Sequence, residues 1–441
     1  MVGAGWAGLA AAVELADAGC AVTVWDMAPT LGGRARSGIP LEVPGLGVSD
    51  LDCGQHILIG AYTDSLRLMK RLGVDLHAAL WRSGLQLIDP HGVGLKLPGG
   101  HPVMAFLRGL VACGGWPLAD RARLLLRMAR WQFQGFQCPA GWTVARLCEG
   151  LPSRVSSELI DPLCVAALNT PSKTADARVF LRVLADGLFA GPGGSDLLIP
   201  RCNLHDLVPG PALNHLQQAG AQVHLGRRVM RIEPMKAPSV QAMVDPGEQT
   251  RWLVHTAHAV ETVDRLVLAT TAGEAARLLQ AWDPAWSQTA MAIPFEPIVT
   301  TWVQAPGAQL PGPMVRLSGG PAQFAFDLSA LGHACSGLFT LVSSDARPWL
   351  DQGLPILEQA VREQALNLPG VQRDQVTIVR SIAERRATMA CTPQLQRPPA
   401  RAAAEHGGAW VAGDYVDGPY PSTLEGAVRA GVAAAHHVMN S

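Results

Sequence analysis

The stretch Gly3-Ala4-Gly5-Trp6-Ala7-Gly8 decides the fold, because it leaves a short apolar segment and opens an alanine-rich run over 9–19. The run ends at a glycine and predicts a helix, and the β-branched segment 21–26 that follows predicts a strand. The first glycine allows a tight turn, the second lets the backbone approach a pyrophosphate, and the third lets helix and strand pack closely. The stretch therefore predicts a Rossmann-type βαβ unit that binds a dinucleotide.

An acidic residue strengthens this interpretation. Asp26 lies eighteen residues after Gly8, at the end of the expected second strand, where a carboxylate can accept hydrogen bonds from ribose hydroxyls. The amides of Trp6 and Ala7 open the helix, whose positive dipole end favours phosphate. A glycine-rich turn without a ligand is the alternative, and Asp26 makes it the less favoured one.

A second glycine-rich segment, Leu31-Gly32-Gly33-Arg34-Ala35-Arg36, follows directly. Gly33 can bring the backbone against a ligand, and the fixed fork of Arg34 can bind phosphate or ribose oxygens. A solvated surface turn is the alternative. The short spacing from Asp26 to Arg34 favours a cofactor contact.

The bulk composition sets limits on size and on partners. With 441 residues the chain exceeds the ~250–300 residues at which one core usually divides, so two domains are expected. Lys and Arg number 35 against 36 Asp and Glu, a net charge of -1 that gives no overall field for nucleic acid. Charged residues make up only 16%, against about 25% in an ordinary soluble domain, which indicates apolar surface or an apolar substrate channel. Because no repeat or low-complexity linker separates the parts, the domains are expected to interleave.

The nine cysteines are scattered and contain no CxxC pair, so reduced thiols in a cytoplasmic protein are expected and no metal site. Neither a signal peptide nor ~18 uninterrupted apolar residues occur, which argues against export by that route and against a membrane span. Before the glycine turn the first strand has only Met1 and Val2, whereas such a strand normally has about four or five residues there. A start codon placed too late would leave that strand truncated.

Further along, the pattern over 62–195 is mainly helical with Pro and Gly breaks. A strand is expected over 222–232, which carries Val229, and another over 265–270. The chain then closes on a strand over 409–414 and a helix from Thr423.

Together with the distal segments Ala412-Gly413-Asp414 and 421–427, these motifs resemble those of the amine oxidase and phytoene desaturase superfamily of FAD proteins. The resemblance implies an α/β fold: a Rossmann-like FAD-binding domain with a parallel sheet, interleaved with a mixed α+β substrate domain. It implies that Gly413 and Asp414 hold the ribityl and pyrophosphate part, and that the amides of Thr423 and Leu424 face the pyrimidine side of the flavin. Val229 is a further expected contact with FAD.

The expected domains are discontinuous. The FAD-binding domain comprises 1–75, 196–272 and 376–441, and the substrate-binding domain comprises 76–195 and 273–375.

Two further segments narrow the resemblance. Asp52-Cys53-Gly54-Gln55-His56 resembles the segment that passes beside the flavin in the desaturase branch, which adds Gly54 and His56 to the expected FAD contacts. The segment 161–171 resembles a signature of the hydroxysqualene dehydroxylases of bacterial hopanoid synthesis, and similar stretches occur over 195–200 and 384–388. The superfamily more often has Glu at the position of Asp26. No lysine or aromatic cage for an amine is evident, so amine oxidation is the poorer interpretation.

The resemblance implies that hydroxysqualene is reduced to squalene, with an allylic hydroxyl replaced by hydride from the reduced flavin while a proton donor assists water loss. His56 and Asp161 are the candidate proton donors. The alternative for His56 is a hydrogen-bonded histidine beside the cofactor, and for Asp161 a helix cap or turn residue before a proline. The electron donor is unknown, since no second GxGxxG with a strand and acid indicates an NAD(P)H domain.

Other functions remain open at this point. A carotenoid or squalene desaturase would use the same flavin in the opposite direction, and a non-catalytic FAD-binding escort of polyprenyl intermediates is a third interpretation. Hydroxysqualene synthase and a membrane surface are candidate partners.

The segment 106–136 carries five arginines against one aspartate, interleaved with aromatic residues, which is typical of an interfacial amphipathic helix. The alternative is a solvated helix packed on the substrate domain. Cytoplasmic localisation is expected, with peripheral attachment to the inner face of the plasma membrane.

Overall fold

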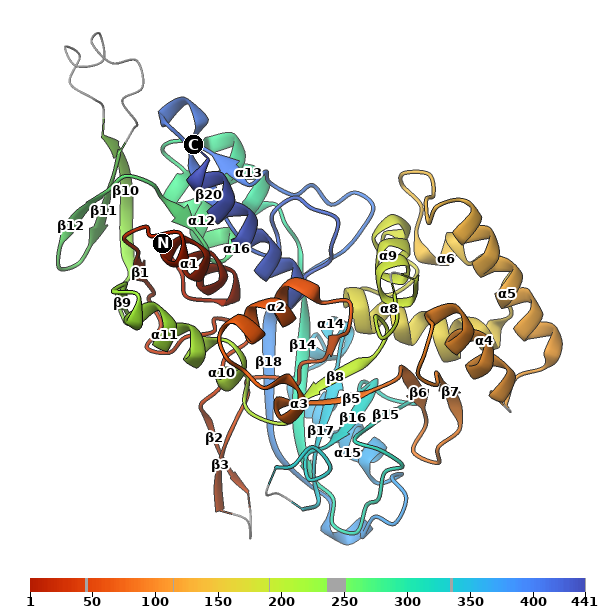
Figure 1. Ribbon diagram of the computed structural model, residues 1–441. Coiled ribbons are helices and arrows are strands. Elements are labelled where there is room, and N and C mark those ends of the chain that lie inside the picture. Colours follow the sequence, from red (N-terminus) through yellow and green to blue (C-terminus); the bar gives the residue numbers. More distant parts are fainter. Residues whose placement is uncertain (44–46, 114, 190, 236–250, 334–335, 441) are drawn as a thin grey trace.

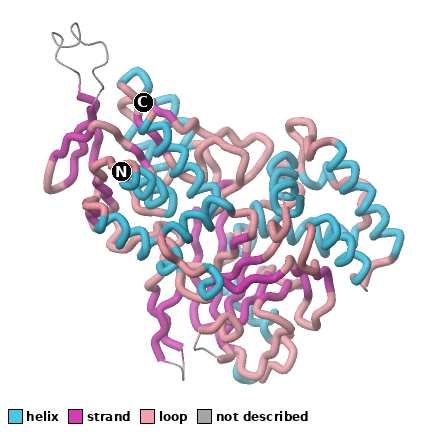
Figure 2. The backbone as a smooth tube through the Cα atoms, in the orientation of Figure 1, coloured by secondary structure: helices cyan, strands magenta, loops and turns pink. Residues whose placement is uncertain are grey.

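A computed structural model describes residues 1–43, 47–113, 115–189, 191–235, 251–333 and 336–440 (Figure 1). Its elements combine helices, parallel strands and antiparallel strands, which confirms the expected α/β class. Figure 2 shows helices in the upper left and centre and at the right, with strands at the far left and in the lower centre. None of the helices described here is both long and apolar enough to cross a bilayer.

A parallel sheet lies at the centre of the first part. Val2 bridges Trp25 on one side and Leu268 on the other, both in parallel, as single bridges rather than as a continuous strand. The expected parallel sheet is therefore present. Its order is β9 (Gln222–His224), β1 (Thr23–Trp25), Val2, β13 (Val267–Leu268) and β20 (Ala409–Val411), with β19 (Arg401–Ala402) antiparallel at the edge.

The first and last long helices of the chain pack against each other beside this sheet (Figure 1). They are α1 (Trp6–Asp17) and α16 (Leu424–Met439). At their contact a side chain on Gly431 would place its Cβ 2.1 Å from the carbonyl oxygen of Ala7. Only glycine permits this approach. Around them lie α2 (Thr63–Arg71), α10 (Leu204–Leu207), α11 (Pro209–Gln218), α12 (Ala272–Leu279), α13 (Pro284–Met291) and the antiparallel strands β10 (Val229–Met235), β11 (Arg251–Thr256) and β12 (Val260–Val263).

A second, antiparallel sheet forms the lower part of the molecule in Figure 1. Its order is β15 (Met314–Arg316), β16 (Phe324–Asp327), β17 (Leu338–Ser343), β14 (Phe295–Gln304) and β18 (Thr377–Met389). Side chains alternate across a strand, so Val299 and Val303 of β14 pack toward α15 (Leu354–Ala365), while Trp302 packs toward the helices on the other side. The short α14 (Arg347–Leu350) precedes α15.

A helical lobe stands at the right of Figure 1. It consists of α4 (Pro102–Ala112), α5 (Leu118–Phe133), α6 (Val144–Leu147), α7 (Ser153–Val155), a π-helical turn at Ser156–Ile160, α8 (Asp161–Leu168), α9 (Ala177–Leu184) and a second π-helical turn at Ala185–Phe189. The expectation of a mainly helical segment over 62–195 is incomplete, because short strands interrupt it. These are β5 (Leu80–Ser83), β6 (Gln86–Ile88) and β7 (Gly94–Lys96).

The remaining elements connect these parts. They are β2 (Ile39–Val43), β3 (Gly47–Leu51), β4 (Leu58–Ile59), α3 (Leu76–Ala79) and β8 (Leu197–Pro200). Because β8 pairs with both β4 and β5, a segment near residue 198 joins segments near 58 and 82. The boundaries expected for the two interleaved domains stay a prediction.

Candidate functional site

The glycine turn at the start of α1 has the geometry that its sequence predicts. Gly3 has a φ of +105°, and a Cβ on it would lie 2.4 Å from the carbonyl oxygen of Ala269. A Cβ on Gly8 would lie 2.0 Å from the carbonyl oxygen of Gly3. Side chains at either position would drive the turn and the neighbouring strand apart. These two glycines set the turn itself.

The other two glycines bring a second loop against the turn. Gly5 caps α1 without a side-chain hydrogen bond, so the amides of Trp6 and Ala7 have no acceptor from a capping side chain. Gly33 has a φ of +64°, and a Cβ on it would lie 3.2 Å from the Cα of Gly5. Two side-chain-free backbones thus meet at the positive end of a helix, which is an arrangement that suits a phosphate.

Asp26 lies where the strand β1 ends and braces the glycine turn. Its Oδ2 accepts from the amide of Ala4 at 2.6 Å, and its Oδ1 accepts from the amide of Ala28 at 2.7 Å. A carboxylate has about four lone-pair positions, so both oxygens can still accept a hydroxyl. The Asp26 carbonyl accepts from the amide of Arg227, which places Val229, at the start of β10, on the segment beside this acid.

Arg34 and Asp414 form an ion pair across the chain. The Asp414 side chain is nearly buried, at 8% exposure, whereas Arg34 keeps 33%. Arg34 also donates to the carbonyl of Ala387 on β18 at 2.8 Å. The N-terminal glycine loop is thereby joined to both the C-terminal segment and the second sheet.

Arg397 has a role that the sequence analysis did not predict. Its guanidinium holds the loop after β20 by donating to a series of backbone carbonyls. A signal for this role was absent because all the acceptors are main-chain groups, which any residue supplies. The carbonyls are those of Asp414, at 2.8 Å, Tyr415, at 3.3 Å, and Gly418 and Tyr420, both at 2.7 Å.

The N-terminus of α16 lies next to this loop. Thr423 caps the helix, because its hydroxyl accepts from the amide of Gly426 at 3.0 Å, and Leu424 begins the helix. The preceding Ser422 accepts from the amide of Met389 at 3.0 Å, which ties the helix start to the end of β18. Gly413 is also confined, since a Cβ there would lie 2.7 Å from the Tyr415 ring.

His56 lies between the Rossmann-type part and the second sheet. Its Nδ1 is 2.9 Å from the carbonyl oxygen of Gly54, and a carbonyl can only accept, so Nδ1 carries the hydrogen and Nε2 is free to accept. Burial lowers the pKa of His56, and the charge of Arg34 lowers it further. We therefore expect a neutral ring at pH 7. A Cβ on Gly54 would lie 3.3 Å from the Thr300 hydroxyl of β14.

Asp161 is placed differently. It begins α8 and accepts a hydrogen bond from the hydroxyl of Ser172. No hydrogen bond or ion pair recorded for the described residues joins Asp161 to His56. His56 therefore lies near Arg34, one of the expected flavin contacts. Asp161 lies at the first residue of α8, and the opposite end of that helix contacts β14 and β18.

That other end is Asn169, which the sequence singled out only as part of a subfamily signature. It is buried and left-handed, with a φ of +47°, a conformation that asparagine tolerates at helix C-termini. Its Nδ2 donates to the Thr388 hydroxyl at 2.9 Å, and its Oδ1 accepts from the Asp345 amide at 2.7 Å. Asn169 therefore fastens the helical lobe to the second sheet.

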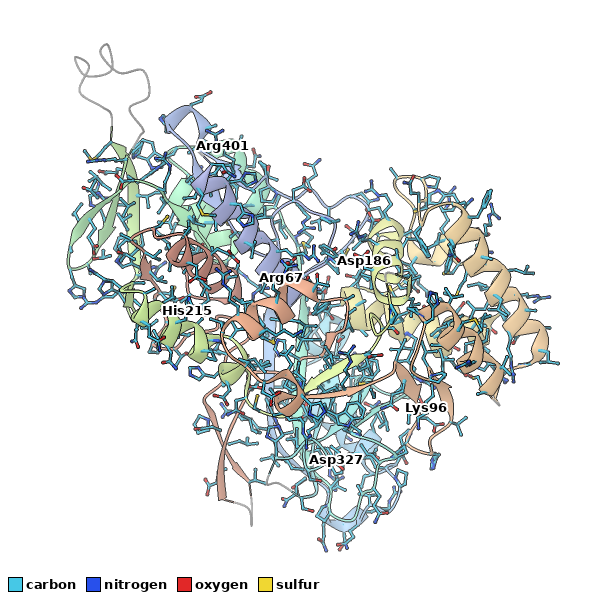
Figure 3. The ribbon with its side chains drawn as sticks, in the orientation of Figure 1. Arg67, Lys96, Asp186, His215, Asp327 and Arg401 are labelled. Carbon is cyan, nitrogen blue, oxygen red and sulfur yellow. The ribbon has the colours of Figure 1, made fainter. Side chains whose placement is uncertain are left out.

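A second connection links the lobe to the C-terminal loop. Asp186, labelled in Figure 3, follows α9 and accepts from the Tyr420 hydroxyl at 2.8 Å and from Arg182 at 2.7 Å. The Arg182 guanidinium also lies 5.3 Å from the centre of the Tyr420 ring. The lobe is thus held at two points near the start of α16.

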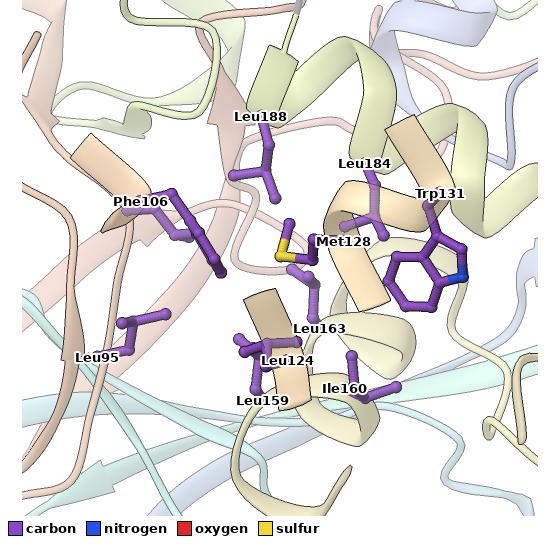
Figure 4. Close-up of a pocket in the computed structure, with 11 residues that line it drawn as sticks. Leu95, Phe106, Leu124, Met128, Trp131, Leu159, Ile160, Leu163, Leu184 and Leu188 are labelled. Atoms are coloured by element: carbon purple, nitrogen blue, oxygen red, sulfur yellow. The ribbon is translucent and has the colours of Figure 1, made fainter. Parts of the chain in front are cut away.

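The interior of the lobe is apolar (Figure 4). A gap of about 10 Å³, roughly the size of one water molecule, remains among side chains that contribute no polar surface. The structure therefore shows a nearly closed apolar interior rather than an open channel, and a ligand would have to part the helices. The lining residues are Leu85, Leu95, Phe106, Leu124, Met128, Trp131, Leu159, Ile160, Leu163, Leu184 and Leu188.

The model of one protein family, the flavin containing amine oxidoreductases, matches residues 6–439. The chain belongs to this family. As a family member it is an oxidoreductase with a flavin cofactor, which confirms the expected enzyme class.

Individual relatives refine the comparison. The chain is 25% identical to the hydroxysqualene dehydroxylase of Zymomonas mobilis, with 99% of this chain and 97% of that protein covered. It is 30% identical to a zeta-carotene desaturase of Zea mays over 112 residues, which cover 25% of this chain and 19% of that protein. Among solved structures, an oxidoreductase from Methanosarcina mazei has a TM-score of 0.68 at 16% identity, covering 100% of this chain and 99% of that one. This last likeness shows the fold.

Proposed function

We propose that this flavoenzyme binds FAD and reduces hydroxysqualene to squalene. The observation that carries the proposal is the similarity to a hydroxysqualene dehydroxylase along nearly the whole of both chains. The similarities to zeta-carotene desaturases cover a smaller share of this chain, 25% in one case and 53% in another. The two glycine loops and Asp26 support FAD in particular, since a dinucleotide has the pyrophosphate and the adenosine ribose that such groups bind.

The residues present fit FAD. Asp26 and Val229 would hold the adenosine part, and the side-chain-free backbones of Gly5 and Gly33, near the amides that open α1, would hold the pyrophosphate. Asp414, held by Arg34, would bind the ribityl chain with Gly413. Gly54, His56 and the start of α16 at Thr423 and Leu424 would hold the flavin ring. The buried Tyr415 hydroxyl, which has no hydrogen-bond partner among the described residues, is a further polar group available to the cofactor.

When bound, reduced FAD supplies the hydride that replaces the hydroxyl. The chain must supply one proton, because the hydroxyl leaves as water while the allylic carbon gains the hydride. His56 is the better placed of the two candidate donors, since it adjoins the expected ring contacts, and Asp161 is the other. Because the His56 ring is neutral at pH 7, it would donate from its protonated form, which becomes more populated as the pH falls. The apolar side chains of the lobe exclude water from the cation that forms as the hydroxyl leaves.

Substrate supply and location follow from this chemistry. Hydroxysqualene would come from a hydroxysqualene synthase, which is the proposed upstream partner, and no nucleic acid takes part. We place the enzyme in the cytoplasm, peripheral to the inner face of the plasma membrane. The electron donor for the flavin is not identified by these residues.

The test is an anaerobic mixture of the photoreduced enzyme with hydroxysqualene, followed through the visible absorbance of oxidised flavin and through product analysis. Return of the absorbance with formation of squalene is the expected result. Bound flavin that stays reduced, with no squalene formed, would overturn the proposed reaction.

A desaturase is the second candidate, favoured by the match to the zeta-carotene desaturase. In this reaction the same site would remove hydrogen from a polyprenyl chain, and the flavin would become reduced. Oxidised enzyme mixed with phytoene or squalene without oxygen distinguishes the two, because only a desaturase would lose its flavin absorbance and form a product with an added double bond.

A further inference from the structure

The outer face of α5 is apolar and exposed. Leu118, Leu126 and Phe133 are 79%, 72% and 94% exposed. With 3.6 residues per turn, these side chains share one stripe with Ala122 and Ala129. The stripe runs for about 22 Å along the helix. Single exposed apolar residues are ordinary, but an ordered row of this length is typical of an interaction surface.

The opposite face of α5 is buried. Leu124, Met128 and Trp131 pack into the lobe and line its apolar gap. The helix is therefore apolar on two sides, although the lobe uses only one. In Figure 1, α5 lies at the outer edge of the molecule, away from the parallel sheet. Nothing in the packing of the described residues covers the outer stripe.

Arginines form the next stripe around the helix. The same period places Arg123, Arg127 and Arg130 side by side, between the apolar stripe and the buried face. Asp120 is the single acidic residue from 102 to 133, against five arginines. The whole chain has a net charge of -1, so this positive charge is local to the lobe.

A cleft of about 320 Å³ continues the arginine stripe. Arg127, Arg130 and Arg146 line it together with glutamines and Trp142, and Glu149 is its only acidic lining residue. Arg127 is held in place by the carbonyls of Leu147 and Glu149, each at 2.6 Å. The guanidinium of Arg146 lies 4.8 Å from the centre of the Trp142 ring. An anionic group entering the cleft would meet positioned guanidinium groups.

We propose that α5 and this cleft form a docking surface for membranes rich in anionic phospholipids. The apolar stripe enters the boundary of the acyl chains, while the neighbouring arginines and the cleft bind lipid phosphates. This charge pattern favours a lipid surface over a protein partner, because a row of arginines from Arg123 to Arg130 runs beside the apolar row and continues into the cleft. The proposal goes beyond the reaction, since the surface would bind membranes whatever the flavin reduces. It places the apolar gap one helix away from the bilayer.

The test measures sedimentation of the flavin-loaded enzyme with vesicles of phosphatidylcholine, with or without phosphatidylglycerol. Binding to the anionic vesicles is expected, weakened by salt because screening reduces the charge attraction. Inorganic phosphate is added at matched ionic strength to distinguish a headgroup in a bilayer from free phosphate. Release by phosphate beyond the effect of salt would point to a free-phosphate site and overturn docking.

Paired variants separate the two stripes. Arg123→Gln with Arg130→Gln should weaken vesicle binding about 25-fold, at roughly fivefold for each charge near an anionic surface. Leu126→Ser with Phe133→Ser should weaken it at every salt concentration. The matched controls are Arg67→Gln with Arg251→Gln and Val260→Ser with Ile356→Ser, exposed residues of α2, β11, β12 and α15, which should bind like the wild type.

Wild-type enzyme provides a measurement that needs no variant. Hydrogen exchange should slow over residues 118–133 when anionic vesicles are added and stay unchanged over α15. Absence of vesicle binding, protection elsewhere, or equal losses in the control variants would each overturn the proposal. Flavin reoxidation by detergent-dispersed hydroxysqualene should be unaltered by the α5 variants, so failure of docking and failure of the proposed reaction are distinguishable.

Discussion

At the scale of single residues, Asp52 is a partly buried carboxylate that joins three segments. It accepts from the Ser37 hydroxyl and, at 2.9 Å, from the Leu204 amide at the start of α10. Burial raises the pKa of Asp52 to about 6, because the charged form loses its hydration. The folded protein therefore holds this proton up to a higher pH than the unfolded chain does.

The sign of the effect on stability follows from this shift. The stabilising contribution of protonated Asp52 is complete below about pH 4, the range in which a free aspartate titrates, and is lost as the pH rises through about 6. Asp52→Asn should remove this part of the pH dependence. Urea unfolding at pH 5 and pH 7.5 measures it, and an unchanged difference between the two pH values in the variant would contradict the assignment.

The planar guanidinium of Arg34 binds two partners: its Nη1 donates to the Ala387 carbonyl and its Nη2 pairs with the Asp414 carboxylate. Lysine cannot reproduce this fork, so Arg34→Lys should weaken FAD binding by about tenfold, which corresponds to roughly 1.4 kcal/mol. Fluorescence titration of the flavin-free protein with FAD measures the change. Arg71→Lys, a surface substitution on α2, is the control and should bind FAD normally.

The proposed role of His56 has a distinct pH signature. Because its pKa lies below the usual range, a rate that depends on protonated His56 should rise as the pH falls below about 6.5. His56→Gln should lower the rate of flavin reoxidation by hydroxysqualene and abolish that rise. Rapid-mixing kinetics across pH provide the measurement. A retained rise in His56→Gln, lost instead in Asp161→Asn, would move the proton donor to Asp161.

The glycine turn could be predicted because its requirement is local: Gly3 and Gly8 leave no room for a side chain on neighbouring backbone. Arg397 and Asn169 could not be assigned their contacts in this way. Their partners are carbonyls, an amide and a hydroxyl that lie far away in the sequence, such as Thr388 for Asn169. No local sequence pattern indicates that residues so far apart in the chain come into contact.

At the scale of elements, the contact of α1 with α16 depends on Gly431. Gly431→Val would place carbon atoms against the Ala7 carbonyl, so the helices must separate, at a cost of about 1–3 kcal/mol for overpacking. We expect a lower thermal midpoint and earlier release of the flavin, followed together by circular dichroism and flavin fluorescence. Ala433→Val adds a β-branched side chain on the exposed side of α16, where it meets no neighbouring backbone, and should cost only about 0.6 kcal/mol of helix propensity. Equal midpoints for the two variants would contradict the close contact.

The strands β5 to β7 were not predicted from the sequence. Each spans three or four residues, too few to display an alternating pattern, and β5 is stabilised by pairing with β8 more than a hundred residues later. The strands β1 and β13 are equally short, but they lie within the apolar runs 21–26 and 265–270, each of which stops at a turn, so the parallel sheet was predictable. The strands β5 to β7 lack such a run and depend on their pairing partners.

At the scale of the whole molecule, Asn169 joins the helical lobe to the second sheet. Asn169→Ala loses the hydrogen bonds to Thr388 and Asp345 and leaves buried groups unpaired, at about 1–3 kcal/mol for each. Asn169→Gly loses the same bonds but accepts the left-handed backbone, so it should be the less destabilised of the two by about 1 kcal/mol. Chemical unfolding measures both variants. Wild-type stability in Asn169→Ala would show that the lobe is held by other contacts.

The meeting of α1 and α16 also has a consequence for how the protein is made. A ribosome adds about 5–20 residues each second, so the first helix emerges tens of seconds before its partner is translated. During that time Gly431, which packs against Ala7, has not been synthesised, and neither has the segment from Gly413 to Leu424 that completes the site beside the glycine loops. A nascent chain stalled before residue 413 should therefore leave the flavin in solution, and cofactor capture would be among the last events of biosynthesis.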